Sequence, residues 1–109
     1  VNWVNYNLPK GTTLLPLSPS VEKILCNLVY GIQIIPISSL QFNEILSERS
    51  YETVIHTLLH LNVSYIYVTN SDLIRLETLE SGLLTVLNVS IIVYETASIR
   101  IYQLPSRSF

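Results

Sequence analysis

Apolar side chains recur along residues 21–29 with the spacing of an amphipathic helix. The intervals of three and four residues place them on one face, because a helix turns about 100° per residue. Ser18 and Pro19 precede this stretch as an N-cap and a first helical residue, and Gly31 follows it where a C-terminal glycine is common. Cys26 is therefore predicted to be a small buried side chain. The expected buried stripe consists of Val21, Ile24, Leu25, Leu28 and Val29.

A second amphipathic helix is predicted over residues 51–61, with Ser50 as its N-cap. Its apolar side chains also follow the helical spacing, so they form one face that should pack against the core. The residues of that face are Val54, Ile55, Leu58 and Leu59.

Two further helical segments have weaker patterns. Residues 1–8 can form a short helix that carries Trp3 and ends before Pro9, because proline disfavours the helical conformation in the residue before it. Residues 73–87 have helical spacing after a turn and cap at 70–72, and Gly82 is expected to break that helix. Residues 39–49 show only enough periodicity for one helical turn.

Short apolar and β-branched runs of strand length alternate with these helices. The run at 32–37 is nearly continuous, which is typical of a strand covered on both faces and therefore of parallel pairing. Only residues 95–98 separate the last two runs, so an antiparallel hairpin is the economical connection. Along its second strand, Ile99 and Ile101 should face one side and Arg100 and Tyr102 the other. The five runs are 12–17, 32–37, 63–69, 89–94 and 99–104.

This order of elements predicts the α/β class. Strands separated by helices favour right-handed βαβ crossovers and helices on both faces of a largely parallel sheet. We expect a three-layer fold with a mostly parallel five-stranded sheet, βαβ units and a C-terminal antiparallel hairpin. Residues 1–104 are predicted to form a single domain and residues 105–109 a flexible tail.

Composition narrows the classes of function. Hydrophobic residues make up 49% of the 109 residues and charged residues 13%, and the net charge is −2. Such a weakly charged chain has no basic stripe for phosphate backbones, so nucleic acid is excluded as an expected partner. No run approaches the roughly 20 apolar residues of a membrane span. The chain also lacks methionine, so we interpret it as an excised or processed piece of a longer protein.

One group of residues has the spacing of a metal site. Glu52, His56 and His60 are four residues apart on the helix predicted for 51–61, so their side chains share one face. That face lies opposite the apolar stripe, however, which favours a solvent-exposed helix surface over a metal centre. We predict neither a metal nor another cofactor.

A weaker candidate site lies where the strands end. Ser18 and Ser20 begin the helix after the first strand, and Asn70 follows the strand at 63–69. Parallel sheets bind ligands at the carboxyl edge of their strands, which would also include Ser38. The segment has no glycine-rich fingerprint, so ordinary helix capping competes with a ligand site.

Catalytic signatures are absent from the sequence. No serine lies in a G-x-S-x-G elbow, and no carboxylate is marked as an acid or base by its neighbours. The sequence therefore gives no support for an enzyme. Asn62 and Asn88 each begin an N-glycosylation sequon just before a predicted strand, but their number is close to what composition gives by chance.

Three motifs resemble a known family. Residues 3–5 with 8–12, read W-V-N and L-P-K-G-T, are similar to a "W-I-x-x-N-x-P-x-G-T" opening. Residues 63–68 are similar to a "G-V-x-Y-I-Y-V" strand in which Asn62 replaces the glycine, and residues 91–94 with 99–102 resemble a closing "V-Y-x-n-x-x-V-x-I-Y" hairpin. These motifs are found in extracytoplasmic domains of archaeal glycosyltransferase-like, oligosaccharyltransferase-related membrane proteins.

The resemblance implies a place and a role. It implies a non-catalytic accessory or recognition domain on the extracytoplasmic face of the cell membrane, because the family's catalytic acidic residues lie on loops between membrane helices. The implied partners are the membrane-embedded remainder of the parent protein and a glycan or a partner subunit. The residues alone leave two alternatives open: a free-standing α/β module for a small ligand, or a protein–protein interaction domain.

Overall fold

The computed structural model describes residues 2–17, 19–28, 31–34 and 47–104. Some of the predictions from sequence lie outside the described residues. They are the Ser18 cap, Val29 of the predicted stripe, the end of the strand expected at 32–37, Ser38, most of the helical turn expected at 39–49, and the tail at 105–109.

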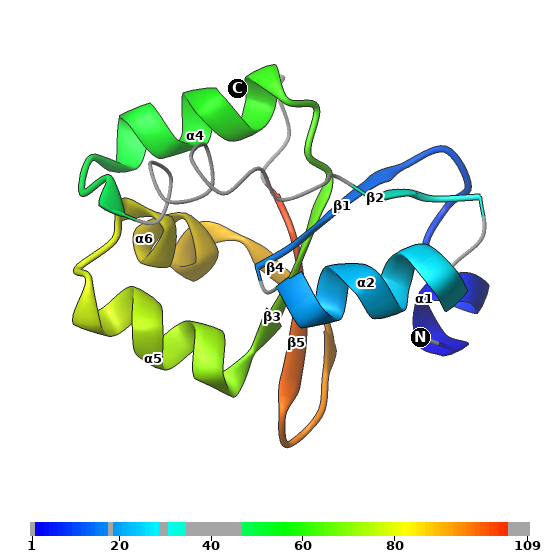
Figure 1. Cartoon of the computed structure of the whole chain (residues 1–109). Coiled ribbons are helices and arrows are strands. Elements are labelled where there is room, and N and C mark those ends of the chain that lie inside the picture. The colour runs from blue at the N-terminus through cyan, green and yellow to red at the C-terminus, as the bar shows by residue number, and fades with distance from the viewer. Residues whose placement is uncertain (1, 18, 29–30, 35–46, 105–109) are drawn as a thin grey trace.

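The described chain contains ten helices and strands, which alternate from α1 to α5 and end in a second helix and a hairpin (Figure 1). The predicted order of elements is confirmed for the short N-terminal helix, the helices that start at Pro19 and after Ser50, and the C-terminal hairpin, whereas the turn expected at 70–72 is helical. Their bounds are α1 Asn2–Asn7, β1 Thr13–Pro16, α2 Pro19–Leu28, β2 Gln33–Ile34, α4 Tyr51–His60, β3 Tyr65–Thr69, α5 Asn70–Thr78, α6 Gly82–Val89, β4 Ile91–Glu95 and β5 Ile99–Gln103.

The strands form a mixed five-stranded sheet in the order β2-β1-β3-β5-β4. β1 pairs in parallel with β2 and β3, whereas β5 is antiparallel to both β3 and β4. Of the five described strands, four therefore point one way and β5 points the other. The expectation of an α/β fold with a mostly parallel sheet and a terminal antiparallel hairpin is confirmed at this level.

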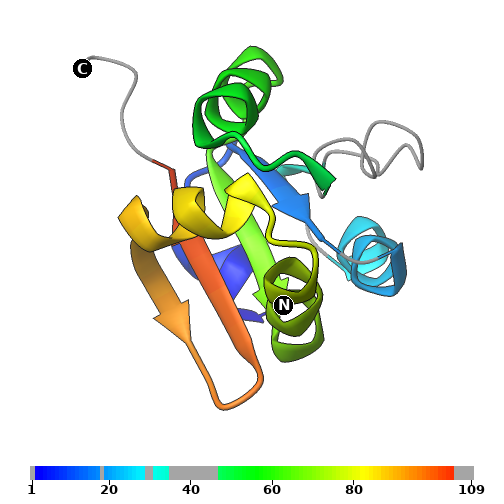
Figure 2. The same cartoon turned by 90° about the vertical axis from the view of Figure 1, so that its left-hand side faces the viewer.

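Two apolar clusters lie on opposite faces of the sheet, because successive strand residues point to opposite sides. One, which we call the α4–α6 cluster, includes Val54, Leu58, Leu76, Val86, Leu15 and Leu17. The other, which we call the α1–α2 cluster, includes Val4, Leu8, Leu25, Tyr67, Ile101 and Leu14. Figures 1 and 2 show α4, α5 and α6 on one side of the strands and α2 on the other. Along β5, Tyr102 joins the α4–α6 cluster and Ile99 and Ile101 the α1–α2 cluster, as alternation predicts.

The stripe predicted for α2 is only partly buried. Leu25 is 1% exposed, but Ile24 is 50% exposed, and Cys26 is exposed rather than buried. The two residues flank Leu25 by about 100° on either side of the helix. Among the described elements α2 lies closest to β1 and β2, and the exposure of Ile24 and Cys26 shows that only a narrow strip of its surface is covered.

The strand predicted at 32–37 is also less enclosed than expected. Its described part, β2, lies at the edge of the sheet, where Gln33 is exposed and Ile34 is half-buried. The predicted parallel pairing is confirmed, but the exposed Gln33 side chain shows that the face it points to is not covered, so the prediction of coverage on both faces was wrong for the described part of this strand.

The predicted break in the helical segment is confirmed, and Gly82 is the first residue of the second helix. The residues expected to form a turn at 70–72 are the first turn of α5, which ends at Thr78, and α6 starts at Gly82 with Ser81 as its N-cap. A Cβ atom on Gly82 would lie 2.8 Å from the carbonyl carbon and oxygen of Ser50. The glycine is therefore required by the close approach of α6 to the backbone before α4.

Candidate functional site

The parallel strands β1 and β3 are neighbours, and the helices that follow them lie on opposite faces of the sheet. After β1 the chain enters α2, whose Leu25 packs in the α1–α2 cluster. After β3 it enters α5, whose Leu76 packs in the α4–α6 cluster on the opposite face. Open α/β sheets bind ligands in the crevice that such a divergence leaves outside the carboxyl ends of the strands. This edge is therefore the candidate site.

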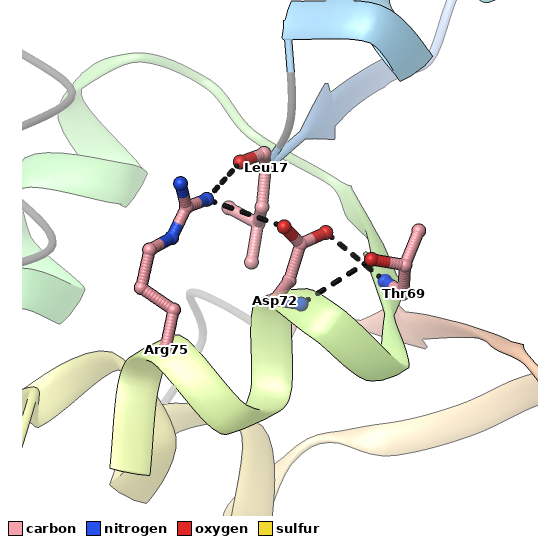
Figure 3. Close-up of polar contacts among 4 residues, drawn as sticks. All are labelled: Leu17, Thr69, Asp72 and Arg75. Atoms are coloured by element: carbon pink, nitrogen blue, oxygen red, sulfur yellow. Dashed lines mark hydrogen bonds and ion pairs between the residues drawn. The ribbon is translucent and has the colours of Figure 1, made fainter. Parts of the chain in front are cut away.

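Asp72 is buried at this edge, with 4% of its surface exposed. It lies in the first turn of α5 and forms a capping box with Thr69 (Figure 3). The Thr69 backbone N–H donates to Asp72 Oδ2 over 3.1 Å, and the Asp72 N–H donates to Thr69 Oγ1 over 3.3 Å. These reciprocal bonds satisfy N–H groups that a helix start leaves without intrahelical partners.

Arg75 joins the end of β1 to α5. Its Nη2 donates to the Leu17 backbone carbonyl over 2.8 Å and lies 3.2 Å from Asp72 Oδ1 (Figure 3). The Arg75 side chain is 43% exposed, so the guanidinium group spans from the buried carboxylate to solvent. Burying a carboxylate alone costs several kcal/mol, and this cation with the Thr69 N–H offsets that cost.

Asp72 and Arg75 were not among the residues predicted for this edge, although their spacing in the sequence contains a signal for their roles. Asp72 lies three residues after Thr69, which is the spacing of a capping box with an acidic third residue. Arg75 lies three residues further on, where a helix brings opposite charges together. The bond from Arg75 to Leu17 joins residues 58 positions apart and has no local signal.

Among the residues predicted for this edge, Asn70 is the one whose surroundings the structure describes fully. It is exposed; its backbone N–H donates to Ser98 O over 3.1 Å and its Nδ2 to Ala97 O over 2.8 Å. Asn70 thus fastens the start of α5 to the tip of the hairpin. Ser20 lies in the first turn of α2, but the structure describes neither its side chain nor Ser18.

The spacing of Glu52, His56 and His60 does not create a metal centre in the structure. All three side chains are exposed on α4, on the face turned away from the core. Within residues 2–17, 19–28, 31–34 and 47–104, no three His, Cys, Asp or Glu side chains come together as a metal-binding group.

The two sequon asparagines lie in different backbone environments. Asn62 is exposed in the turn between α4 and β3, where its φ is 61°. Asn88 is also exposed, but it belongs to the last turn of α6. No glycan assignment follows from exposure alone.

Aromatic side chains gather on the sheet face that carries α1. The Trp3 ring stacks on Tyr94 with 4.7 Å between the ring centroids. Tyr67 lies in the same cluster, and burial, followed by the nearby Tyr94, raises the pKa of the Tyr67 hydroxyl above its usual value of about 10. The protonated phenol is therefore the form that the folded protein favours.

No helix in the described part of the chain is both long and apolar enough to cross a membrane.

Comparison with known proteins identifies no relative of this chain. No protein-family model, no curated protein and no solved structure matches the chain.

Proposed function

We propose that this chain is a non-catalytic recognition domain that binds its ligand at the carboxyl edge of β1 and β3. The observation that carries the proposal is the divergence of α2 and α5 to opposite faces of the sheet. Ligand binding in α/β sheets is concentrated at such positions. Arg75 and Asn70 lie there on exposed parts of α5, and their side chains already donate to the carbonyls of Leu17 and Ala97.

The interactions of Asp72 favour recognition over catalysis. Its two carboxylate oxygens accept from the Thr69 N–H and from Arg75, so both are engaged within the protein. A general base must reach a proton on its substrate, and this carboxylate is buried behind its own partners. The role that fits Asp72 is to hold the start of α5 against the end of β1.

The ligand class and the setting come from the resemblance of the sequence motifs. We propose that the domain belongs to an archaeal glycosyltransferase-like, oligosaccharyltransferase-related membrane protein and lies on the extracytoplasmic face of the cell membrane. It would contact the membrane-embedded remainder of that protein and a glycan. The positive φ of Asn62 supports the correspondence of motifs, because glycine and asparagine both tolerate this region and the family has glycine there. The two apolar clusters likewise support a three-layer arrangement.

Binding at the carboxyl edge can be tested by titrating the ¹⁵N-labelled chain with neutral and acidic oligosaccharides. We expect the amide signals of Leu17, Asn70 and Ser71 to shift with saturation. Arg75→Lys keeps a cation beside Asp72 but removes the planar guanidinium donors, so it should weaken binding. The matched control is Arg49→Lys, since Arg49 also forms an ion pair, with Glu80 at 3.4 Å, but is 74% exposed elsewhere.

Two results would contradict the proposal. One is the absence of saturable shifts with every oligosaccharide, and the other is a set of shifts that clusters away from residues 17 and 69–75. A free-standing ligand-binding module would use the same edge, and the upstream sequence of the gene would distinguish it, because membrane helices there favour the glycosyltransferase-like parent.

A further inference from the structure

The charges at the carboxyl edge of β1 and β3 are paired within the protein, and this bears on the class of ligand that the edge can take. The Asp72 carboxylate is buried and lies 3.2 Å from Arg75 Nη2. On the neighbouring strand β5, Arg100 lies opposite Val68, and its Nε is 2.6 Å from the carboxylate of Glu95. Both of these cations therefore already have an anion beside them.

The chain has few other cations that an acidic ligand could use. The whole sequence contains 6 lysine and arginine residues. Arg49 is paired with Glu80 at 3.4 Å, and Lys10 donates to a carbonyl of α1 from the segment before β1, at the opposite end of that strand. The remaining two are Lys23, which is exposed on α2, and Arg107, which lies outside the described residues. An acidic ligand at this edge would thus lose hydration of its charge with little electrostatic gain to offset that loss.

The start of α5 already has an anion of its own. The first N–H groups of a helix attract negative charge, because the helix dipole places partial positive charge there. In this helix the Asp72 carboxylate accepts from the Thr69 N–H, and the Asp72 N–H donates to Thr69 Oγ1 (Figure 3). The Asn70 N–H donates to the carbonyl of Ser98. The Asp72 carboxylate therefore takes the place that an anionic ligand would otherwise fill.

We infer that the ligand of the carboxyl edge is uncharged, and that the domain selects neutral oligosaccharides over acidic ones. The inference rests on the proposed binding at this edge and adds the charge of the ligand. A uronic acid would bring a second negative charge to a guanidinium group that Asp72 already neutralises. A cationic sugar would meet a carboxylate whose two oxygens already accept from Thr69 and Arg75. The hydroxyl groups of a neutral sugar need hydrogen bonds but no opposite charge.

The test compares sugars that differ in charge. The ¹⁵N-labelled chain is titrated with tetrasaccharides of glucose, galactose and mannose, and with the corresponding uronic-acid tetrasaccharides. At least one neutral sugar should shift the amide signals of Leu17 and Asn70 with saturation, and its uronic-acid counterpart should bind at least about tenfold more weakly. Raising NaCl from about 0.02 to about 0.5 M should change the affinity for the neutral sugar less than about twofold, because salt screens charges and this ligand has none.

Asp72→Asn should allow acidic sugars to bind. The substitution removes the negative charge and nearly keeps the shape of the side chain, so the charge of Arg75 is no longer offset by Asp72. The affinity for the uronic-acid sugar should then rise at least about fivefold. The matched control is Glu77→Gln, which changes the net charge equally at an exposed position further along α5 and should leave that affinity unchanged. Circular dichroism establishes the folding of both variants, and if Asp72→Asn does not fold, the natural chain with the two sugar series decides the question.

Three results would count against the inference. A uronic-acid sugar that binds at residues 17 and 69–75 as tightly as its neutral counterpart overturns it, while the proposed binding edge stands. Loss of such acidic binding in Lys23→Gln would then identify Lys23 as the cation that the ligand uses. A folded Asp72→Asn chain with unchanged affinity for acidic sugars overturns the charge argument in the same way. The absence of saturable binding by every sugar contradicts the inference and the proposed function together.

Discussion

α4 and α2 are both ten-residue helices with apolar stripes in the sequence, but the fold uses them differently. Val54, Ile55 and Leu58 of α4 are all buried, whereas on α2 Leu25 is buried and Ile24 is half exposed. α4 packs closely against α6 and shares a cluster with strand residues, whereas among the described elements α2 lies closest to β1 and the edge strand β2. The number of neighbours, and not the stripe alone, sets how much of a helix is buried.

The largest effects should come from the buried leucine at the centre of each helix. Leu58 is 0% and Leu25 1% exposed, so Leu58→Ala and Leu25→Ala should each lower the free energy of unfolding by about 2–5 kcal/mol. Urea denaturation measures both values. A loss below about 1 kcal/mol for Leu25→Ala would show that α2 contributes little to stability. The two helices would then differ more in their contributions to stability than the similar burial of the two leucines indicates.

The packing of α6 under α4 can be broken at Gly82. An added methyl group would press on Ser50 backbone atoms, 2.8 Å away, and on Arg49, so Gly82→Ala should destabilise by about 1–3 kcal/mol. Asn88→Ala, at an exposed position of the same helix, is the control and should change stability little. Chemical denaturation distinguishes them. A stabilised Gly82→Ala chain would mean that α6 moves away from α4 without penalty.

Tyr67, on the sheet face that carries α1 and α2, should make the stability of the protein depend on pH in the alkaline range. Burial, and then Tyr94, raises the pKa of Tyr67, so the unfolded chain loses this proton at a lower pH than the folded one. The contribution to stability is complete below about pH 10 and is lost as pH rises through the folded pKa. Denaturation of Tyr67→Phe between about pH 9 and 11 should show a shallower decline than the natural chain. Equal slopes would contradict this assignment.

The smallest effects are expected on the exposed sides of the two helices. His60→Ala on α4 should change stability by no more than about 0.5 kcal/mol, because the side chain is exposed and no described metal group includes it. Ile24→Ala on α2 should cost clearly less than Leu25→Ala, since Ile24 is 50% exposed. A cost at Ile24 equal to that at Leu25 would mean that something covers α2 in solution.

Much of the fold could be predicted because its signals are local. The cap at Ser50, the helix start at Pro19 and the alternation along residues 99–102 each depend on residues within a few positions of one another. The candidate site could be placed only in part. The order of the strands predicted the carboxyl edge and the position of Asn70. It could not predict that Arg75, the ion-pair partner of Asp72, also donates to the carbonyl of Leu17, because Leu17 is distant in sequence.

The sequence by itself determined the type and order of the elements, because helical and strand periodicities and capping residues act over one or two turns. The tertiary structure decided which side of each stripe is covered. It left Ile24 and Cys26 exposed on α2, placed Gly82 against Ser50 and exposed Ile91 at the rim of the sheet. The physical reason is that burial depends on which elements lie alongside in space, and neighbours such as Arg75 and Leu17 are brought together only when the sheet assembles.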